Sequence, residues 1–357
     1  MDLSTDLPPL NVGLIGYGIA GAVFHAPLIS TTPGLRLAAV VTSDPARREQ
    51  AARSHPQAAL LPDADALWAA APELGLDLVV VASPNRTHIP LATAALEAGL
   101  PVVVDKPLAA TSAEAEKLAA LAAERGLLLS VFQNRRWDGD FRTVRQLIAS
   151  GRLGRVNRFE SRFERWRPEL SGAWRELGDP AEAGGLLFDL GSHLVDQALQ
   201  LFGPATRVYA ELDARRTGAA TDDDSFVALT HADGTRSHLW MSATAGDLGP
   251  RFRVLGSQGA YVTHGLDGQE DALRRGRTPA DPDWGVFPRE RWGSLRAGDT
   301  VEPVATLPGT YQDYYAGLVE ALHGRGPVPV AAGDAVEALR VLEAAQRSAR
   351  DGTAVTL

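Results

Sequence analysis

Short apolar runs alternate with alanine-rich stretches over residues 11–134. The runs are NVGLIG, LRLAAVVT, DLVVVAS, PVVVDKP and LLLSVFQN, and their aliphatic and β-branched residues are typical of buried strands. The stretches between them carry helix caps: Asp44 precedes Pro45, and Thr111 stands three residues before Glu114. Strands that alternate with helices predict parallel βαβ units. We expect an α/β dinucleotide-binding domain over residues 11–134, preceded by a flexible N-terminus over residues 1–10.

The pattern changes after residue 135, where strand-like segments follow one another directly. They are VNRFESRF, DSFVALTHADGTRSHLWMS and RFRVLGSQGAYVTHG, and the second turns at Asp233-Gly234, a dipeptide typical of tight hairpins. Helical patterns also occur over 310–323 and 334–350, whereas DGQEDALRRGRTPADPDWGVFPRERWG is polar and proline-punctuated and predicts a long ordered loop. We expect residues 135–357 to form an α/β domain for substrate binding and oligomerisation, with a large, mostly antiparallel open sheet.

One helix is predicted within this second region, in GGLLFDLGSHLVDQALQLFG. Its apolar stripe contains Leu187, Leu190, Leu194, Ala198 and Leu201. Asp189 and His193 lie four residues apart, so they share one helical face, and Asp196 and Gln200 continue that face. The pattern predicts a buried apolar face and a polar face opposite to it.

Composition narrows the possible partners. The chain has 357 residues, 45% of them hydrophobic, which suits two globular domains. Its net charge of −9, without a basic block, argues against nucleic acid as a partner. It has no cysteine and no long apolar stretch, and it begins with the acidic segment MDLSTDLPPLN, so we expect a cytoplasmic protein without a membrane span. Its eight histidines include no H-x-x-x-H pair, so we expect no metal site.

Three glycines stand where the first predicted strand ends and the first helix begins. Gly16 permits a tight turn, Gly18 allows the backbone to approach a pyrophosphate, and Gly21 allows close packing of helix and strand. The N-terminus of the helix then attracts the phosphates. The alternative is a purely structural turn between strand and helix, but the βαβ context favours a Rossmann dinucleotide site.

The end of the second predicted strand bears on the choice of cofactor. Asp44 lies at a distance from the glycines that suits an acid bound to the ribose of NAD, but it is better placed as a helix N-cap. Thr42 and Ser43 are then left at the strand end, with Arg47 and Arg48 one turn into the helix. Hydroxyls and arginines suit a 2′-phosphate, so we predict NADP, with NAD also possible. A solvated arginine pair is the alternative.

Lys106 is placed at the carboxyl edge of the predicted parallel sheet, where ligands bind. Taken alone, such a lysine is more often a surface charge. Asp189 could likewise only stabilise a helix N-terminus, and His193 could be an ordinary, partly exposed histidine. A cofactor-binding domain earlier in the chain favours a functional role for all three.

Several segments together resemble one family of oxidoreductases. GLIGYGIAG, SPNRTH, DKP, GGLLFDLGSH and HGLDGQEDALRRG have the order and spacing found in the Gfo/Idh/MocA family, and the likeness covers nearly the whole chain. Within the family, members similar to scyllo-inositol dehydrogenase have counterparts of FHAPLI, NRRWDGDF and GLDGQEDAL. The resemblance implies a Rossmann domain, a second domain with a large open sheet, and a site in the cleft between them.

The resemblance also implies roles for individual residues. Lys106, Asp189 and His193 correspond to the catalytic residues, and Asp105 replaces a glutamate of the family's Glu-Lys-Pro motif, so its contact with the nicotinamide ribose is expected to be altered or water-mediated. Trp166 and Arg167 would lie near the substrate together with the catalytic three, and a cis Lys106-Pro107 bond is implied. The glycine turn, the end of the second predicted strand and the resemblance together give these expected cofactor contacts: Gly16, Tyr17, Gly18, Ile19, Ala20, Thr42, Ser43, Arg47, Ser83, Pro84, Asn85, His88, Asp105, Lys106, Gln133, Asn134, Arg136 and Trp137.

The resemblance implies a dehydrogenase that transfers a hydride between NADP and a secondary alcohol or ketone of a polyol, inositol or sugar. His193 is our choice of base, because its ordinary pKa lies near neutrality, with Lys106 stabilising the alkoxide and Asp189 orienting the hydroxyl or the imidazole. Lys106 as proton acceptor is the alternative. A sugar-responsive regulator that binds NADP without turnover and an NAD-dependent glycosidase are rival interpretations. Because the second sheet has too few helices to cover both faces, we expect a homodimer or homotetramer.

Overall fold

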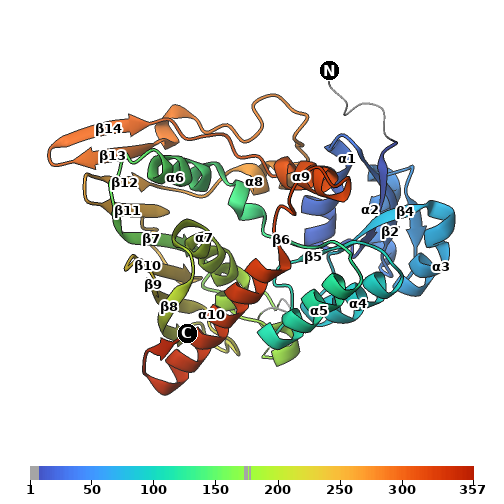
Figure 1. The fold of residues 1–357 in the computed structure, drawn as a ribbon, viewed down its shortest axis with the longest axis horizontal. Helices are drawn as coiled ribbons and strands as arrows, with labels where there is room; N and C mark the ends of the chain where they lie inside the picture. Colours follow the sequence, from blue (N-terminus) through green and yellow to red (C-terminus); the bar gives the residue numbers. More distant parts are fainter. Residues whose placement is uncertain (1–7, 173–175, 177) are drawn as a thin grey trace.

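The computed structural model describes residues 8–172, 176 and 178–357, shown in Figure 1. Residues 1–7 of the expected flexible N-terminus lie outside this description. The first part of the chain forms a six-stranded parallel sheet, here sheet A, in the order β3-β2-β1-β4-β5-β6. Its strands are β1 (Leu10–Ile15), β2 (Leu35–Val41), β3 (Ala59–Leu61), β4 (Leu76–Val81), β5 (Val102–Asp105) and β6 (Leu129–Phe132). Five were predicted; β3 was missed because three residues carry too little periodicity.

Helices connect these strands and cover both faces of the sheet, as is usual for a doubly wound fold (Figure 1). They are η1 (Ala20–His25), a π-turn continued by α1 (Ala26–Thr31), then α2 (Pro45–Ser54), α3 (Ala64–Leu74), α4 (His88–Glu97) and α5 (Ser112–Glu124), with short 3₁₀ turns η2 (Asn85–Thr87) and η3 (Asn134–Trp137). The predicted caps are confirmed, because Asp44 accepts hydrogen bonds from two backbone N–H groups of α2, and Thr111 accepts one from Glu114. The strand order reverses between β1 and β4, so the glycine turn after β1 stands at the switch point of the sheet.

The rest of the chain builds a nine-stranded sheet, sheet B, in the order β14-β13-β12-β11-β7-β10-β9-β8-β15. It is antiparallel except where β7 and β10 run parallel. The strands are β7 (Val156–Glu164), β8 (Ala205–Asp213), β9 (Asp224–His231), β10 (Arg236–Ser242), β11 (Phe252–Gly256), β12 (Ala260–Thr263), β13 (Gly293–Ala297), β14 (Thr300–Val304) and β15 (Val355–Thr356). The helical elements are α6 (Gly139–Ala149), η5 (Pro180–Glu182), η6 (Leu187–Gly191), α7 (Ser192–Phe202), α8 (Gln269–Arg274), η7 (Arg289–Arg291), α9 (Gln312–Leu322) and α10 (Ala332–Asp351).

Two expectations for this region need correction. The expected long loop contains a helix, α8, because GQEDALRR combines good helix formers with acidic residues in the first turn. Most of the expected polar face of α7 is buried as well as its leucine stripe: His193 and Asp196 are buried, whereas Gln200 is exposed. Asp196, on that face, is 2% exposed and binds the guanidinium of Arg136 through two hydrogen bonds of 2.8 and 2.5 Å.

The end of the chain returns to the first domain. The Glu343 carboxylate of α10 accepts hydrogen bonds from the backbone and hydroxyl of Ser112, and the Tyr314 hydroxyl of α9 donates to Ser130 of β6. Through these contacts the two C-terminal helices bind the first domain, in addition to the covalent connection after β6. The peptide bond between Lys106 and Pro107 is cis, as expected. No helix in the described ranges has the length and apolarity needed to cross a membrane.

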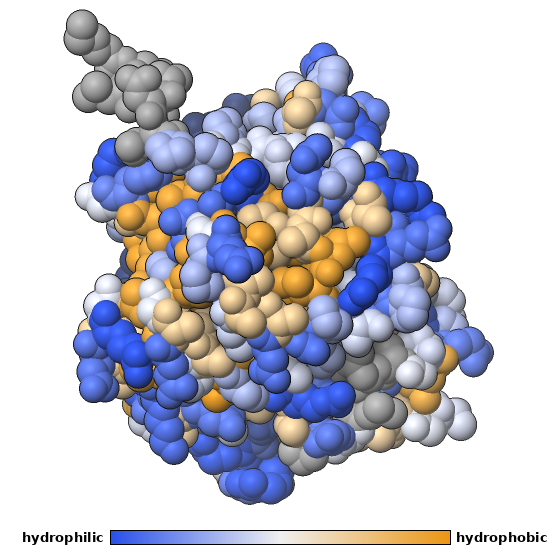
Figure 2. Space-filling model, turned by 90° about the vertical axis from the view of Figure 1, so that its right-hand side faces the viewer, coloured by the Kyte–Doolittle hydropathy of each residue, from blue (hydrophilic) through white to orange (hydrophobic). Residues whose placement is uncertain are grey.

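The side of the molecule formed by the first domain is shown in Figure 2. Apolar residues gather near the middle of this face, and hydrophilic residues surround them. Helix α3, which lies on this side in Figure 1, has the sequence ADALWAAAPEL and buries only Leu67 fully, so small apolar residues remain at the surface.

Candidate active site

The three glycines serve different physical purposes. Gly16 has a φ of +98°, which favours glycine, and a Cβ there would contact the Ala82 backbone. A Cβ on Gly21 would overlap the carbonyl of Gly16, so this position needs glycine for packing. A Cβ on Gly18 would contact only Nη1 of Arg47, at 3.8 Å, and would otherwise project into open space. No protein packing therefore requires a glycine at position 18, and this open position fits a cofactor phosphate that approaches the backbone closely.

The residues after β2 are arranged around the same turn. Thr42 is buried, Ser43 is exposed, and the Arg47 guanidinium reaches over Gly18 while its Nε lies 3.8 Å from Asp44. Because the Asp44 carboxylate caps α2, it is used in the helix as predicted. Arg47 is about half exposed and is free to meet an additional anion.

The segment SPNRTH contacts the chain next to Lys106, at the end of β5. His88 is buried, with Nδ1 2.8 Å from the carbonyl oxygen of Pro107 and Nε2 3.0 Å from that of Ser83. The Asn85 amide donates to the carbonyl of Glu182 in the second domain. His88 therefore links the ends of β4 and β5, while Asn85, after Pro84, links the two domains. The Tyr17 side chain, 3% exposed, also packs inward.

Lys106 and Asp189 meet across the domain boundary. The Lys106 ammonium donates to the Asp189 carboxylate at 2.8 Å and to its backbone carbonyl at 2.6 Å. Lys106 lies directly after β5 and Asp189 in η6, so the pairing requires both domains in place. We expected Asp189 to orient the substrate or the imidazole; in the structure its carboxylate binds the lysine, and no hydrogen bond between Asp189 and His193 is present in the described chain.

His193 has one ring nitrogen held by the protein. Its Nδ1 lies 3.0 Å from Oε1 of Gln133, and an amide oxygen only accepts, so Nδ1 carries the proton. Burial, and then the charge of Lys106, lower the pKa of His193 well below its usual value. The imidazole is therefore neutral, with its Nε2 lone pair available on the other side. Gln133, which we predict to contact the cofactor, positions this histidine through its amide oxygen.

The Asp105 carboxylate lies beside a second buried imidazole. Nε2 of His25 is 3.9 Å from Oδ1 of Asp105, too far for a direct hydrogen bond, and its Nδ1 lies 2.6 Å from the Tyr315 hydroxyl. Burial alone would raise the pKa of Asp105, but His25, Lys106 and His88 outweigh it and keep the pKa below its usual value. The Asp105 carboxylate is thus held as an anion.

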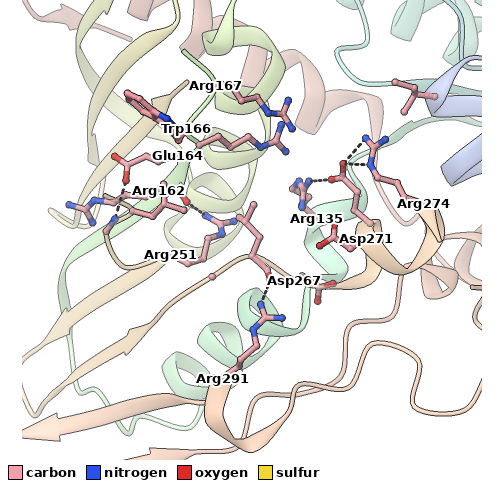
Figure 3. A pocket seen from close by; sticks show the side chains of 17 residues that line it. Arg135, Arg162, Glu164, Trp166, Arg167, Arg251, Asp267, Asp271, Arg274 and Arg291 are labelled. Atoms are coloured by element: carbon pink, nitrogen blue, oxygen red, sulfur yellow. Dashed lines mark hydrogen bonds and ion pairs between the residues drawn. The ribbon is translucent and has the colours of Figure 1, made fainter. Parts of the chain in front are cut away.

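Two cavities adjoin these groups and share several lining residues. The one of about 300 Å³ contains Lys106, Asp189 and His193 together with Ile19 and Ala20 of the glycine turn, and Asp105 and Asn134 also line it. The other, of about 760 Å³, contains Trp166 and Arg167, the two residues expected near substrate (Figure 3). The structure thus brings the expected catalytic and substrate residues to one continuous region.

Among the expected cofactor residues, Ile19, Ala20, Asp105, Lys106 and Asn134 line the smaller cavity, whereas Arg136 and Trp137 line neither cavity. The guanidinium of Arg136 binds Asp196 and, at 2.9 Å, Asp334, and the Trp137 ring packs edge-on against Tyr314. Both side chains thus contact helices α7, α9 and α10 of the second domain rather than the cavities. Conversely, Arg135, Arg165, Glu270 and Arg274 line both cavities but were not singled out from the sequence. Arg135, Glu270 and Arg274 lie in NRRWDGDF and HGLDGQEDALRRG, two segments that resemble the family, but no local pattern indicates where a charged side chain points.

Both domains of the chain match models of known protein families. Residues 10–133 match the family model of the oxidoreductase family with an NAD-binding Rossmann fold, and residues 141–262 match the GFO/IDH/MocA C-terminal domain. The chain belongs to the Gfo/Idh/MocA family of oxidoreductases. Its resemblance to that family, first seen in separate motifs, is thereby confirmed over both domains.

Individual members of the Gfo/Idh/MocA family are similar over almost their full length. The uncharacterized oxidoreductase YdgJ of Escherichia coli is 41% identical, with 96% of each chain covered. The scyllo-inositol 2-dehydrogenase (NADP(+)) IolW of Bacillus subtilis is 35% identical, covering 98% of this chain and 96% of IolW. The solved structure of YvaA from B. subtilis has a TM-score of 0.92 at 35% identity, covering 98% and 99% of the two chains.

Proposed function

We propose that this protein is an NADP-dependent dehydrogenase that oxidises a secondary alcohol of a polyol, inositol or sugar, or reduces the corresponding ketone. One observation carries the proposal: a neutral histidine and a lysine from different domains line one cavity next to the glycine turn. The name of the similar protein IolW supports both the cofactor and the class of substrate.

The residues suit acid-base catalysis at a carbinol. The Nε2 lone pair of His193 accepts the hydroxyl proton, because Gln133 keeps the other nitrogen protonated. Lys106 donates toward the oxygen on which negative charge develops, and Asp189 fixes the position of the ammonium. The nicotinamide cofactor, when bound, accepts or supplies the hydride. In the reverse direction the same histidine returns the proton.

The cofactor would be held by the glycine turn and by residues after β2 and β4. The open position beside Gly18 fits the pyrophosphate, and Arg47, above it, fits a 2′-phosphate. Because Asp44 is committed to its helix cap, no acid of the strand end is aimed at that phosphate, which favours NADP over NAD.

Initial rates with scyllo-inositol, other inositols and common aldoses, each with NADP⁺ and NAD⁺, test this proposal. We expect absorbance of the reduced cofactor to increase, with kcat/KM at least tenfold higher for NADP⁺, which corresponds to about 1.4 kcal/mol. Arg47→Ala should remove most of that preference and leave the rate with NAD⁺ nearly unchanged. Equal efficiency with both cofactors would contradict the NADP assignment. Cofactor binding without reduction of any substrate would favour the regulator instead.

A further inference from the structure

Two arginines that line both cavities have no acidic partner in the described chain. Arg165 and Arg167 follow the end of β7 in an extended segment, and their backbone N–H groups donate to Ser242 and Ala243. Being two residues apart in an extended chain, their side chains extend to the same side. Neither guanidinium forms an ion pair with a described carboxylate, whereas Arg162 and Arg216 nearby each form at least one.

The other arginines around the larger cavity are already held by the protein. Arg135 and Arg274 both bind the Glu270 carboxylate, at 2.8 and 2.9 Å (Figure 3). Arg251 donates to Ser161 and Gln197. The described lining contains seven arginines but only four acidic residues, although the whole chain has a net charge of −9. Positive charge is therefore concentrated at the substrate end of the site.

Two neighbouring guanidinium groups repel each other, and this repulsion raises the free energy of the protein unless an anion binds between them. Arg165 is partly buried, and burial first, then the charge of Arg167, lower the pKa of its guanidinium; Glu270 opposes this effect. A carboxylate or phosphate placed between two planar guanidinium groups accepts paired, charge-assisted hydrogen bonds and offsets the repulsion. A neutral hydroxyl would accept a hydrogen bond but leave the charges uncompensated.

The position of the pair indicates which molecule supplies the anion. Arg165 and Arg167 line the cavity that contains Lys106 and His193, so one small molecule can reach both pairs of residues. Arg47, the residue suited to the cofactor's 2′-phosphate, belongs to α2 and lines neither cavity. The unpaired charges thus serve the substrate side of the cleft.

We propose that the substrate is an anionic sugar or polyol, whose carboxylate or phosphate group is bound by Arg165 and Arg167 while its carbinol lies at His193 and Lys106. This inference rests on the proposed function and narrows the substrate from polyols in general to charged ones.

The test compares three molecules with the same ring: glucose, glucuronate and glucose 6-phosphate. Calorimetry with the NADP⁺-bound protein measures their binding, and absorbance measures their oxidation. We expect glucuronate or glucose 6-phosphate to bind at least tenfold more tightly than glucose, and the preferred anion distinguishes a carboxylate site from a phosphate site. Arg167→Gln and Arg165→Gln should each remove most of this preference without changing the Kd for NADP⁺. Arg145→Ala, which removes an exposed charge outside both cavities, should keep it.

Two results would overturn the inference: equal binding of glucose and both anions, or a preference for an anion that survives in both glutamine variants. Because Arg167 is exposed, its variant is expected to fold, and its melting temperature verifies this. Tight binding of an anion with no oxidation of any compound would leave the anion site intact and contradict the dehydrogenase. Oxidation of uncharged polyols with no preference for anions would support the dehydrogenase and contradict the anion site.

Discussion

At the scale of single residues, the state of His193 is set by its surroundings rather than by its own chemistry. Gln133 fixes the proton on Nδ1, and burial together with Lys106 opposes a second proton. A free histidine would be partly protonated near pH 6.5, and its protonated fraction could not accept a proton. The pocket thus prepares the base before substrate arrives.

Substitutions of His193 and Gln133 should lower the rate of catalysis without weakening the binding of NADP⁺. His193→Ala should lower kcat by about a hundredfold or more, the usual contribution of general base catalysis. Gln133→Leu should lower kcat by roughly tenfold, because the tautomer is no longer fixed. Fluorescence titration should show a nearly unchanged Kd for NADP⁺ in both variants. If Gln133→Leu instead weakens cofactor binding and leaves kcat intact, the original assignment of Gln133 to the cofactor is correct.

The pH profile of oxidation follows from the same pKa. Protonation of Nε2 removes the base, so a lowered pKa moves the acid-side loss of activity to lower pH. We expect kcat/KM to stay level between pH 8 and about 6.5 and to fall only well below the ordinary histidine pKa of about 6.5. A half-maximal point at or above 6.5 in the wild-type profile would show that the histidine is not held neutral.

At the scale of elements, the segment from Gly16 to Gly21 has one glycine required for packing and one that leaves open space for a ligand. Gly21→Ala should destabilise the fold by about 1–3 kcal/mol, because its methyl group would overlap the Gly16 carbonyl. Gly18→Ala should change the free energy of unfolding by less than about 0.5 kcal/mol, but weaken NADP⁺ binding at least tenfold, because its methyl group would occupy the open space. Thermal unfolding and cofactor titration measure the two effects. Gly333→Ala, where a Cβ contacts nothing, is the control for both.

At the scale of the whole molecule, sheet B has one face covered by helices of its own chain. Val227 and Leu239 are fully buried on the face that α7 and α10 cover, whereas Phe226 and Trp240 point the other way and are half-buried. Their rings lie 5.1 Å apart, with the guanidinium of Arg162 over the tryptophan. This arrangement supports our proposal that a second copy covers the outer face.

Light scattering should therefore report a dimer or tetramer at micromolar concentration. Trp240→Glu places a charge on the outer face and should shift the population toward smaller species, while Arg145→Ala should not. A wild-type protein that remains monomeric at these concentrations would refute the proposal.

The sequence by itself determined the features that depend on neighbours along the chain. Alternation of apolar runs and capped helices predicted sheet A, and the spacing of Gly16, Gly18 and Gly21 predicted the turn at its switch point. The motif after β5 placed Lys106 at the carboxyl edge. Such signals are local because backbone hydrogen bonding and helix capping involve residues only a few positions apart.

Only the tertiary structure decided which side chains meet. Lys106 binds Asp189, 83 positions later in the chain, and Gln133 contacts His193, 60 positions later. Arg136, which we expected at the cofactor, donates hydrogen bonds to Asp196. That Arg165 forms no ion pair with a carboxylate of the described residues is likewise visible only in the tertiary structure. Pairing of charges depends on distances between remote segments, and those distances are set by the packing of two whole domains, which no local pattern in the chain encodes.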